Sequence, residues 1–116
     1  MTGVRSFLNN PHYGFYVVAV QEHRIIGCLM ITYEWSDWRD GVQWWLQSVY
    51  VHPEFRRMGV FHLMYEFIRG KAVQAKNVCG IRLYVDRDND VAKNTYKALG
   101  MEPANYLVYE LSLENS

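Results

Sequence analysis

The chain has 116 residues, of which 50% are hydrophobic and 16% aromatic, so we expect one domain, 1–116, with its own core. Twelve basic and twelve acidic residues balance, which excludes a global positive field for nucleic acid or an anionic membrane. No apolar run approaches the roughly 20 residues that span a bilayer, and no signal peptide is evident, so we expect a cytoplasmic protein. The four histidines lack metal-ligand spacing, so we expect no metal.

The first half of the chain reads as strands. Dense apolar or alternating runs predict three of them, at 15–20, 25–35 and 43–52. A polar turn at 21–24 separates the first two runs and predicts a hairpin. A polar loop with an Asp-Gly pair, at 36–42, leads to the third run, which Pro53 ends.

The period then changes. Apolar residues recur at helical spacing over 59–75, and residues 81–86 alternate again as in a strand. A strand, a helix and a strand in this order predict a parallel βαβ unit with a right-handed crossover. An acidic turn at 86–90 starts a second helix that Gly100 closes, and 106–113 reads as a last strand. The expected fold is α/β, with the order β-β-β-α-β-α-β.

One junction carries the chemistry. Residues 49–61 read VYVHPEFRRMGVF, which is a strand, a Pro-marked turn, two arginines and a glycine that opens a helix. Such a junction gathers backbone N–H groups at the positive end of a helix dipole, which suits a phosphate. Of Arg56 and Arg57, we expect one to contact phosphate and the other to be solvated.

Two motifs then give the chain a family resemblance. The first has the form Arg/Gln-x-x-Gly-x-Gly/Ala after a strand, and here it reads Arg56-Arg57-Met58-Gly59-Val60-Phe61. The second has the form Asn-x-x-Ala-x-x-x-Tyr-x-x-Leu-Gly-Phe, and here it is Asn89, Ala92, Tyr96, Leu99, Gly100 and Met101. With both motifs in order, the chain resembles the GNAT superfamily of acyl-CoA-dependent N-acyltransferases over 15–113.

The chain departs from the family pattern in two places. Phe61 stands where the family has Gly or Ala, so we expect its side chain to point away from the phosphates. The family also opens with a strand and one or two helices, whereas only about fourteen residues precede the hairpin here. We therefore expect a GNAT-like mixed sheet without these elements, as a natural short form or a truncated product. The exposed edge strand that results favours a homodimer.

The resemblance implies acetyl-CoA as the cosubstrate. The diphosphate would bind the amides of 56–61, and pantetheine would bind backbone groups of Val49, Tyr50 and Val51 and the side chain of Asn89. Three or four charge-assisted bonds total about 5–12 kcal/mol. Micromolar affinity corresponds to about 8 kcal/mol and association has an entropic cost, so pantetheine contacts must add to the loop.

The resemblance also implies attack of a neutral amine on the thioester carbonyl, through a tetrahedral intermediate. A backbone N–H near Val49 or Tyr50 would stabilise the oxyanion, and Tyr96 would protonate or hydrogen-bond the departing sulfur. Tyr96 could instead be a core aromatic of its helix. Glu34 is the candidate base, because burial in its apolar stretch would make the carboxylate a better proton acceptor. The alternatives are a solvated Glu34, His52 or a water relay.

The acceptor and its pocket stay open. Small amines, amino acids, peptide N-termini and protein lysines are all compatible with the sequence. The four tryptophans, Trp35, Trp38, Trp44 and Trp45, either pack the core or line an acceptor wall that stacks on a substrate. Two other functions compete with catalysis: a non-catalytic coenzyme A-binding module and a structural dimerisation domain with a vestigial site.

Overall fold

The computed structural model describes residues 11–113 of the chain. Contacts divide the chain into two compact units, Met1–Tyr84 and Val85–Ser116. After a short 3-10 helix, η1 (Pro11–Tyr13), the first unit contains a four-stranded sheet and one long helix. The second unit contains helix α3 (Asp90–Ala98). The expected single domain stays a prediction.

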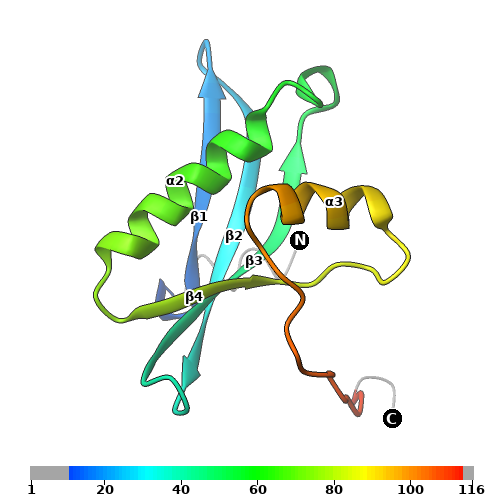
Figure 1. Ribbon diagram of the computed structural model, residues 1–116. Coiled ribbons are helices and arrows are strands. Elements are labelled where there is room, and N and C mark those ends of the chain that lie inside the picture. Colours follow the sequence, from blue (N-terminus) through cyan, green and yellow to red (C-terminus); the bar gives the residue numbers. More distant parts are fainter. Residues whose placement is uncertain (1–10, 114–116) are drawn as a thin grey trace. The chain divides into compact units, whose positions relative to one another are not determined.

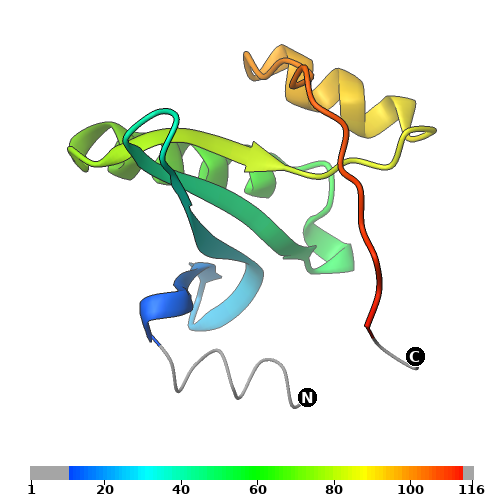
Figure 2. The ribbon, with the colours of Figure 1, turned by 90° about the horizontal axis from the view of Figure 1, so that it is seen from below.

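The sheet is mixed, as predicted. Its strands are β1 (Gly14–Gln21), β2 (Arg24–Ser36), β3 (Gly41–Val51) and β4 (Val78–Leu83). Their order in the sheet is β1-β2-β3-β4; β2 is antiparallel to both β1 and β3, and β4 is parallel to β3. The sheet twists strongly between β1 and β4 (Figures 1 and 2). The predicted hairpin and the parallel βαβ unit are both confirmed.

Helix α2 (Val60–Gln74) covers one face of the sheet (Figure 1). Its apolar residues recur at helical spacing and are buried: Val60, Met64, Tyr65, Ile68 and Ala72. The sheet offers this helix a face of fully buried aliphatic residues that includes Leu29 and Ile31. Burying each such side chain stabilises the fold by about 1.5–3 kcal/mol. The helix predicted over 59–75 is confirmed, with Gly59 and Ala75 as its caps.

Gly27 allows α2 to approach β2 closely. A Cβ atom at this position would lie 2.9 Å from Val60 Cγ1 and 3.2 Å from Met64 Cε. A larger residue would therefore push the first turn of α2 off the sheet. Since the loop that precedes α2 contains the motif at 56–61, this contact also sets where that motif lies against the sheet.

The opposite face of the sheet is polar and aromatic. Side chains alternate between faces along a strand, and the register pairs Thr32 with Trp45 and Trp45 with Arg82. These residues therefore lie opposite the face that α2 covers. We call this surface the polar face, and it consists of Thr32, Glu34, Trp45, Gln47, Arg82 and Tyr84; Gln43 lies on the same side of the sheet but is buried.

Two predicted strands differ from the structure. The strand expected at 81–86 is Val78–Leu83, because its pairing with β3 begins where Val42 meets Val78. The last strand, expected at 106–113, is not formed. These residues have no regular structure, and their large apolar side chains are exposed. High strand propensity expresses fit to a paired, half-buried surface, so it does not make a strand without a neighbour.

The second unit confirms that its helix starts in the turn at 86–90 and closes at Gly100. The Asn89 Oδ1 accepts the N–H of Ala92 at 3.0 Å and so caps the N-terminus of α3. At the other end, Gly100 has a φ of 92°, and its N–H donates to the carbonyl of Lys97. The N–H of Met101 donates to the carbonyl of Tyr96, which completes a Schellman motif.

Candidate functional site

Strand β3 has an open edge where the backbone contacts to pantetheine are expected. Its pairing with β4 ends at Leu46 and Leu83, whereas β3 itself continues to Val51. Within residues 11–113, no strand pairs with 47–51 on this side of β3. Backbone groups on an unpaired strand edge bind an extended chain that carries amides, as pantetheine does.

A β-bulge shapes the same stretch of β3. Cys28 pairs with Tyr50 and Met30 pairs with Gln47, so the two residues 48–49 face a single residue of β2. Ser48 has a φ of 53°, which is left-handed backbone. Bulges interrupt the ladder, bend the strand and often lie beside active sites. The bulge includes Val49 and is followed by Tyr50, and the N–H groups of these two residues are the predicted oxyanion donors.

The loop before α2, where the diphosphate is expected, combines left-handed backbone with the start of a helix. Arg57 has a φ of 65° and Gly59 a φ of 79°, so left-handed residues flank Met58. Gly59 is the N-cap of α2, and no side chain caps the helix there. The first intrahelical bond runs from the N–H of Leu63 to the carbonyl of Gly59. Amides at the start of α2 are therefore directed toward the loop, at the positive end of the helix dipole.

The side chains of this loop take different roles. The Arg56 Nε donates to the carbonyl of Val51 at 3.2 Å and ties the loop to the end of β3. Arg57 is exposed, and in the described part of the chain it forms no ion pair. Phe61 is half-buried, and its ring centre lies 6.2 Å from that of Tyr65, one turn further along α2.

Arg24, which the sequence did not indicate as a site residue, holds the start of the loop. The short helix η2 (Pro53–Phe55) begins after His52, whose Nδ1 accepts the N–H of Glu54 at 3.2 Å. One nitrogen of Arg24 lies 3.3 Å from His52 Nε2 and 3.7 Å from Glu54 Oε2, and the guanidinium lies over the ring of Phe55. Arg24 comes 28 residues before His52, so no local motif could indicate it.

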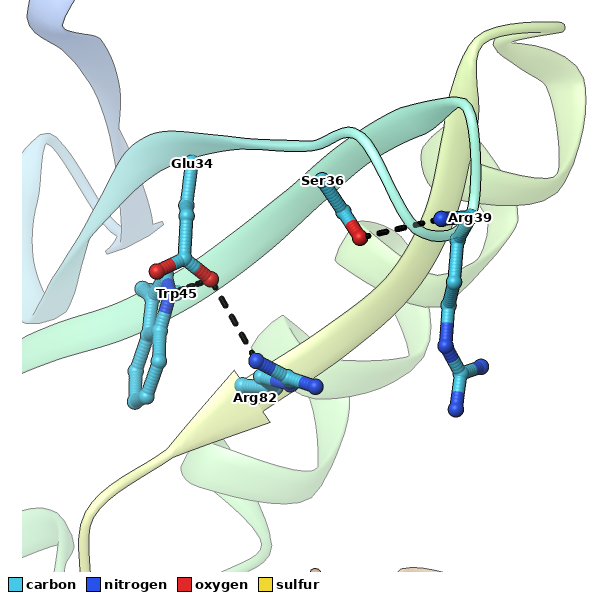
Figure 3. A network of polar contacts seen from close by, with 5 residues as sticks. All are labelled: Glu34, Ser36, Arg39, Trp45 and Arg82. Carbon is cyan, nitrogen blue, oxygen red and sulfur yellow. Dashed lines mark hydrogen bonds and ion pairs between the residues drawn. The ribbon is translucent and has the colours of Figure 1, made fainter. Parts of the chain in front are cut away.

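Glu34 lies in a different environment from the one expected. Its side chain is 48% exposed, so the predicted burial in an apolar stretch is wrong. The reason is the alternation along β2, which places Glu34 on the polar face. Its Oε1 accepts the indole N–H of Trp45 at 3.2 Å and pairs with Arg82 at 3.3 Å (Figure 3). Glu34 as the general base stays a prediction.

The structure separates the predicted site residues into two groups. The open edge, 49–51, and the loop, 56–61, both belong to the first unit. Asn89 and Tyr96 belong to the second unit, on helix α3 and its cap. Because the Oδ1 of Asn89 caps α3, its amide N–H₂ is the part of the side chain that can serve a ligand.

The four tryptophans do not form one cluster. Trp44 is buried and packs edge-on against Phe15 at 5.1 Å, so it belongs to the core. Trp45 lies on the polar face and stacks on Tyr84 at 4.5 Å. Trp35 and Trp38 are exposed.

Within residues 11–113 no group of three or more His, Cys, Asp or Glu side chains could hold a metal ion. No helix in that range is long and apolar enough to cross a membrane.

Comparison with known proteins agrees with this arrangement. The family "Acetyltransferase (GNAT) family" matches residues 2–101. The chain therefore belongs to the GNAT acetyltransferase family, which uses acetyl-CoA. No curated protein matches the sequence.

Solved structures share the fold. A possible acetyltransferase from Clostridium difficile 630 is 39% identical, with a TM-score of 0.91; the match covers 97% of this chain and 74% of that one. AAC(6')-Iy, in complex with the bisubstrate analog CoA-S-monomethyl-acetylneamine, is 15% identical, with a TM-score of 0.77; the match covers 96% of this chain and 76% of that one. The second likeness shows the fold alone.

Proposed function

We propose that the chain is an N-acetyltransferase that moves the acetyl group of acetyl-CoA to an amine. The observation that carries this proposal is the left-handed loop at the uncapped start of α2, which follows the open edge of β3. The loop offers amides to a diphosphate, and the edge offers amides and carbonyls to pantetheine. In support, AAC(6')-Iy has this fold and its complex holds a CoA-containing analog.

In the proposed reaction, the neutral amine attacks the thioester carbonyl directly. A backbone N–H at the bulge, from Val49 or Tyr50, stabilises the oxyanion of the tetrahedral intermediate. The C–N bond forms, the C–S bond breaks and the thiolate of coenzyme A leaves. Tyr96 donates a hydrogen bond or its proton to the sulfur, and Glu34 or a water relay accepts the proton of the amine.

Release of free thiol from acetyl-CoA over a panel of amines tests the proposal. Replacement of Tyr96 by Phe is expected to lower kcat by about 10²-fold or more, the usual size of a general-acid contribution. Acetyl-CoA should bind this variant as it binds the unmodified chain, because the loop is untouched. Tyr109→Phe, an exposed position in the same unit, is the matched control and should keep full activity.

The outcomes separate the competing functions. Binding of acetyl-CoA without turnover of any amine would contradict catalysis and favour a coenzyme A-binding module. An absence of binding by the folded chain would favour a structural domain with a vestigial site. Equal rates for Tyr96→Phe and the unmodified chain would remove the role of Tyr96 alone.

A further inference from the structure

On the polar face, Glu34, Trp45, Arg82 and Tyr84 form a cluster whose contacts add little to the stability of the fold. The Glu34 Oε1 holds both the indole of Trp45 and the Arg82 guanidinium, which lies 5.9 Å above the Trp45 ring centre (Figure 3). Tyr84 stacks on Trp45 and is 66% exposed. A half-exposed ion pair adds little to stability, and exposed aromatic rings add less than buried ones. The cluster is therefore organised in a way that folding alone does not require.

The cluster still has binding capacity. Within residues 11–113, the contacts of the Glu34 side chain with Trp45 and Arg82 both use Oε1, so Oε2 is not engaged by another residue of that range. Arg82 has five N–H donors, and its hydrogen bond to Glu34 uses Nη1. The cluster thus presents a carboxylate oxygen, guanidinium donors and a stacked pair of rings on one surface.

Its position relates it to the open edge of β3. Trp45 pairs with Arg82 one residue before the last β3–β4 pair, Leu46 and Leu83. The cluster therefore lies where the two strands part. If pantetheine extends along 49–51 from the loop, its thioester end points along β3 toward Trp45. The assignment of an acceptor to this cluster therefore rests on the proposed function.

We propose that the polar face is the acceptor site and that the acceptor is a zwitterionic amine, an α-amino acid with an aromatic or other apolar side chain. Its ammonium pairs with the free oxygen of Glu34, and its carboxylate pairs with Arg82. These two groups lie 3.3 Å apart in the structure, and an amino acid carries its ammonium and carboxylate on one carbon, so both pairs form together. The apolar side chain packs on Trp45 and Tyr84.

The same placement accounts for the protons of the reaction. The bound ammonium gives one proton to Glu34, which passes it to solvent, and the neutral nitrogen then attacks the thioester carbonyl. The C–N bond forms as the C–S bond breaks, and the second proton of the nitrogen ends on the sulfur of coenzyme A. The products are the N-acetyl amino acid and coenzyme A thiol, with no other reactant.

Three ligands that differ in one group each test the proposal: phenylalanine, phenethylamine without the carboxylate, and 3-phenylpropionate without the amine. Acetylation of phenylalanine should exceed that of phenethylamine in kcat/KM by about tenfold to a hundredfold, the effect of one charge-assisted hydrogen bond. Arg82→Gln should reduce this preference by the same factor, mainly through KM. Arg39→Gln removes an exposed arginine whose guanidinium lies apart from Glu34 in Figure 3, and should keep the preference.

A second readout does not depend on the cofactor. Titration of phenylalanine into the chain without acetyl-CoA should shift the indole N–H resonance of Trp45, which bonds Glu34, more than that of exposed Trp38. 3-Phenylpropionate should shift it less. Equal rates for phenylalanine and phenethylamine, or an unmoved Trp45 resonance, would overturn the acceptor assignment. If phenylalanine moves Trp45 but acetyl-CoA does not bind, the proposed function fails while the ligand site stands.

Discussion

Arg57 and Gly59 both adopt left-handed backbone in the loop before α2, and Arg57 bears its conformational strain. Left-handed backbone costs a residue with a Cβ about 1–2 kcal/mol, and Arg57 adopts it at a φ of 65°. Gly59 adopts it without that cost. Strain of this kind persists where the surrounding structure imposes it, and it is concentrated at binding sites. The backbone of these two residues is thus the residue-scale basis for the proposed diphosphate site.

Two glycines offer a matched test of this backbone. A Cβ at Gly59 or at Gly70 would meet nothing within 4 Å, but only Gly59 has a positive φ. Gly59→Ala should cost about 1–2 kcal/mol of unfolding free energy and weaken acetyl-CoA binding, because the loop must change conformation. Gly70→Ala, inside α2, should stabilise the chain by about 0.5–1 kcal/mol and leave binding unchanged. Urea unfolding and calorimetry measure both quantities.

The two glycine variants together test whether the left-handed backbone of the loop serves the cofactor. Equal acetyl-CoA affinities for the two variants would show that the left-handed backbone at Gly59 does not serve the cofactor. An unfolding free energy that rises in Gly59→Ala would show that the residue is not held at positive φ in solution.

At the scale of elements, the loop is attached to the sheet by Arg24. This residue starts β2, yet it contacts His52, Glu54 and Phe55 around η2. Arg24→Ala should therefore raise the Kd of acetyl-CoA roughly threefold to tenfold, because ordering the loop would then be part of binding. Arg39→Ala is the control, because it also removes one positive charge from an exposed position of the first unit. A Kd that changes equally in the two variants would point to net charge and not to this attachment.

The elements show what could be predicted from the sequence. The hairpin, the parallel crossover and α2 follow from periodicity and turn residues, which are local, and so do the start of α3 in the turn at 86–90 and its end at Gly100. The motif at 56–61 has a fixed spacing along the chain, so it too is a local feature. The strand at 106–113 could not be judged this way, because a strand depends on a neighbour that propensity does not specify.

The candidate site shows the same limit. Apolar neighbours in the sequence suggested a buried Glu34, but alternation along β2 turns its side chain to the polar face, beside Arg82 of a distant strand. Arg24 and Arg82 reach the site only through tertiary contacts, so no spacing along the chain could reveal them. A motif can indicate residues at a fixed spacing along the chain, whereas residues that the fold brings together become visible only in the structure.

At the scale of the whole molecule, one buried group links stability to pH. Burial raises the pKa of Tyr65 above its ordinary value near 10; Arg69 opposes this effect and Glu66 adds to it. The folded chain thus holds the Tyr65 proton more tightly than the unfolded chain does. The associated stability is complete below about pH 10 and is lost as the pH rises above that value through the folded pKa.

Urea unfolding between about pH 8 and pH 11 should therefore show a steeper loss of stability for the unmodified chain than for Tyr65→Phe. Tyr109→Phe, at a 90% exposed position, should follow the unmodified chain and so controls for the other tyrosines. If Tyr65→Phe loses stability as steeply as the unmodified chain, burial of this phenol does not contribute to alkaline unfolding.

The edges of the sheet lead to a prediction about association. Within residues 11–113, β1 pairs only with β2, and its Val18 and Val20 are at least half exposed. An unpaired apolar edge is a template for another strand, so we propose a homodimer in which a second copy covers β1. Sedimentation at micromolar concentration should show a dimer, and Val18→Lys should shift it toward the monomer. A monomer in the unmodified chain would exclude this assembly.

Binding of the diphosphate by the loop before α2 is tested most directly by calorimetry of the folded chain with acetyl-CoA and, separately, with S-acetylpantetheine. S-acetylpantetheine shares the thioester arm but lacks the diphosphate. If the loop before α2 binds the diphosphate through three or four amides, acetyl-CoA should bind at micromolar to millimolar Kd and S-acetylpantetheine should bind far more weakly, by about 100-fold or more. Equal affinity for the two compounds, or no heat with acetyl-CoA from a folded sample, would show that the loop before α2 does not bind the diphosphate.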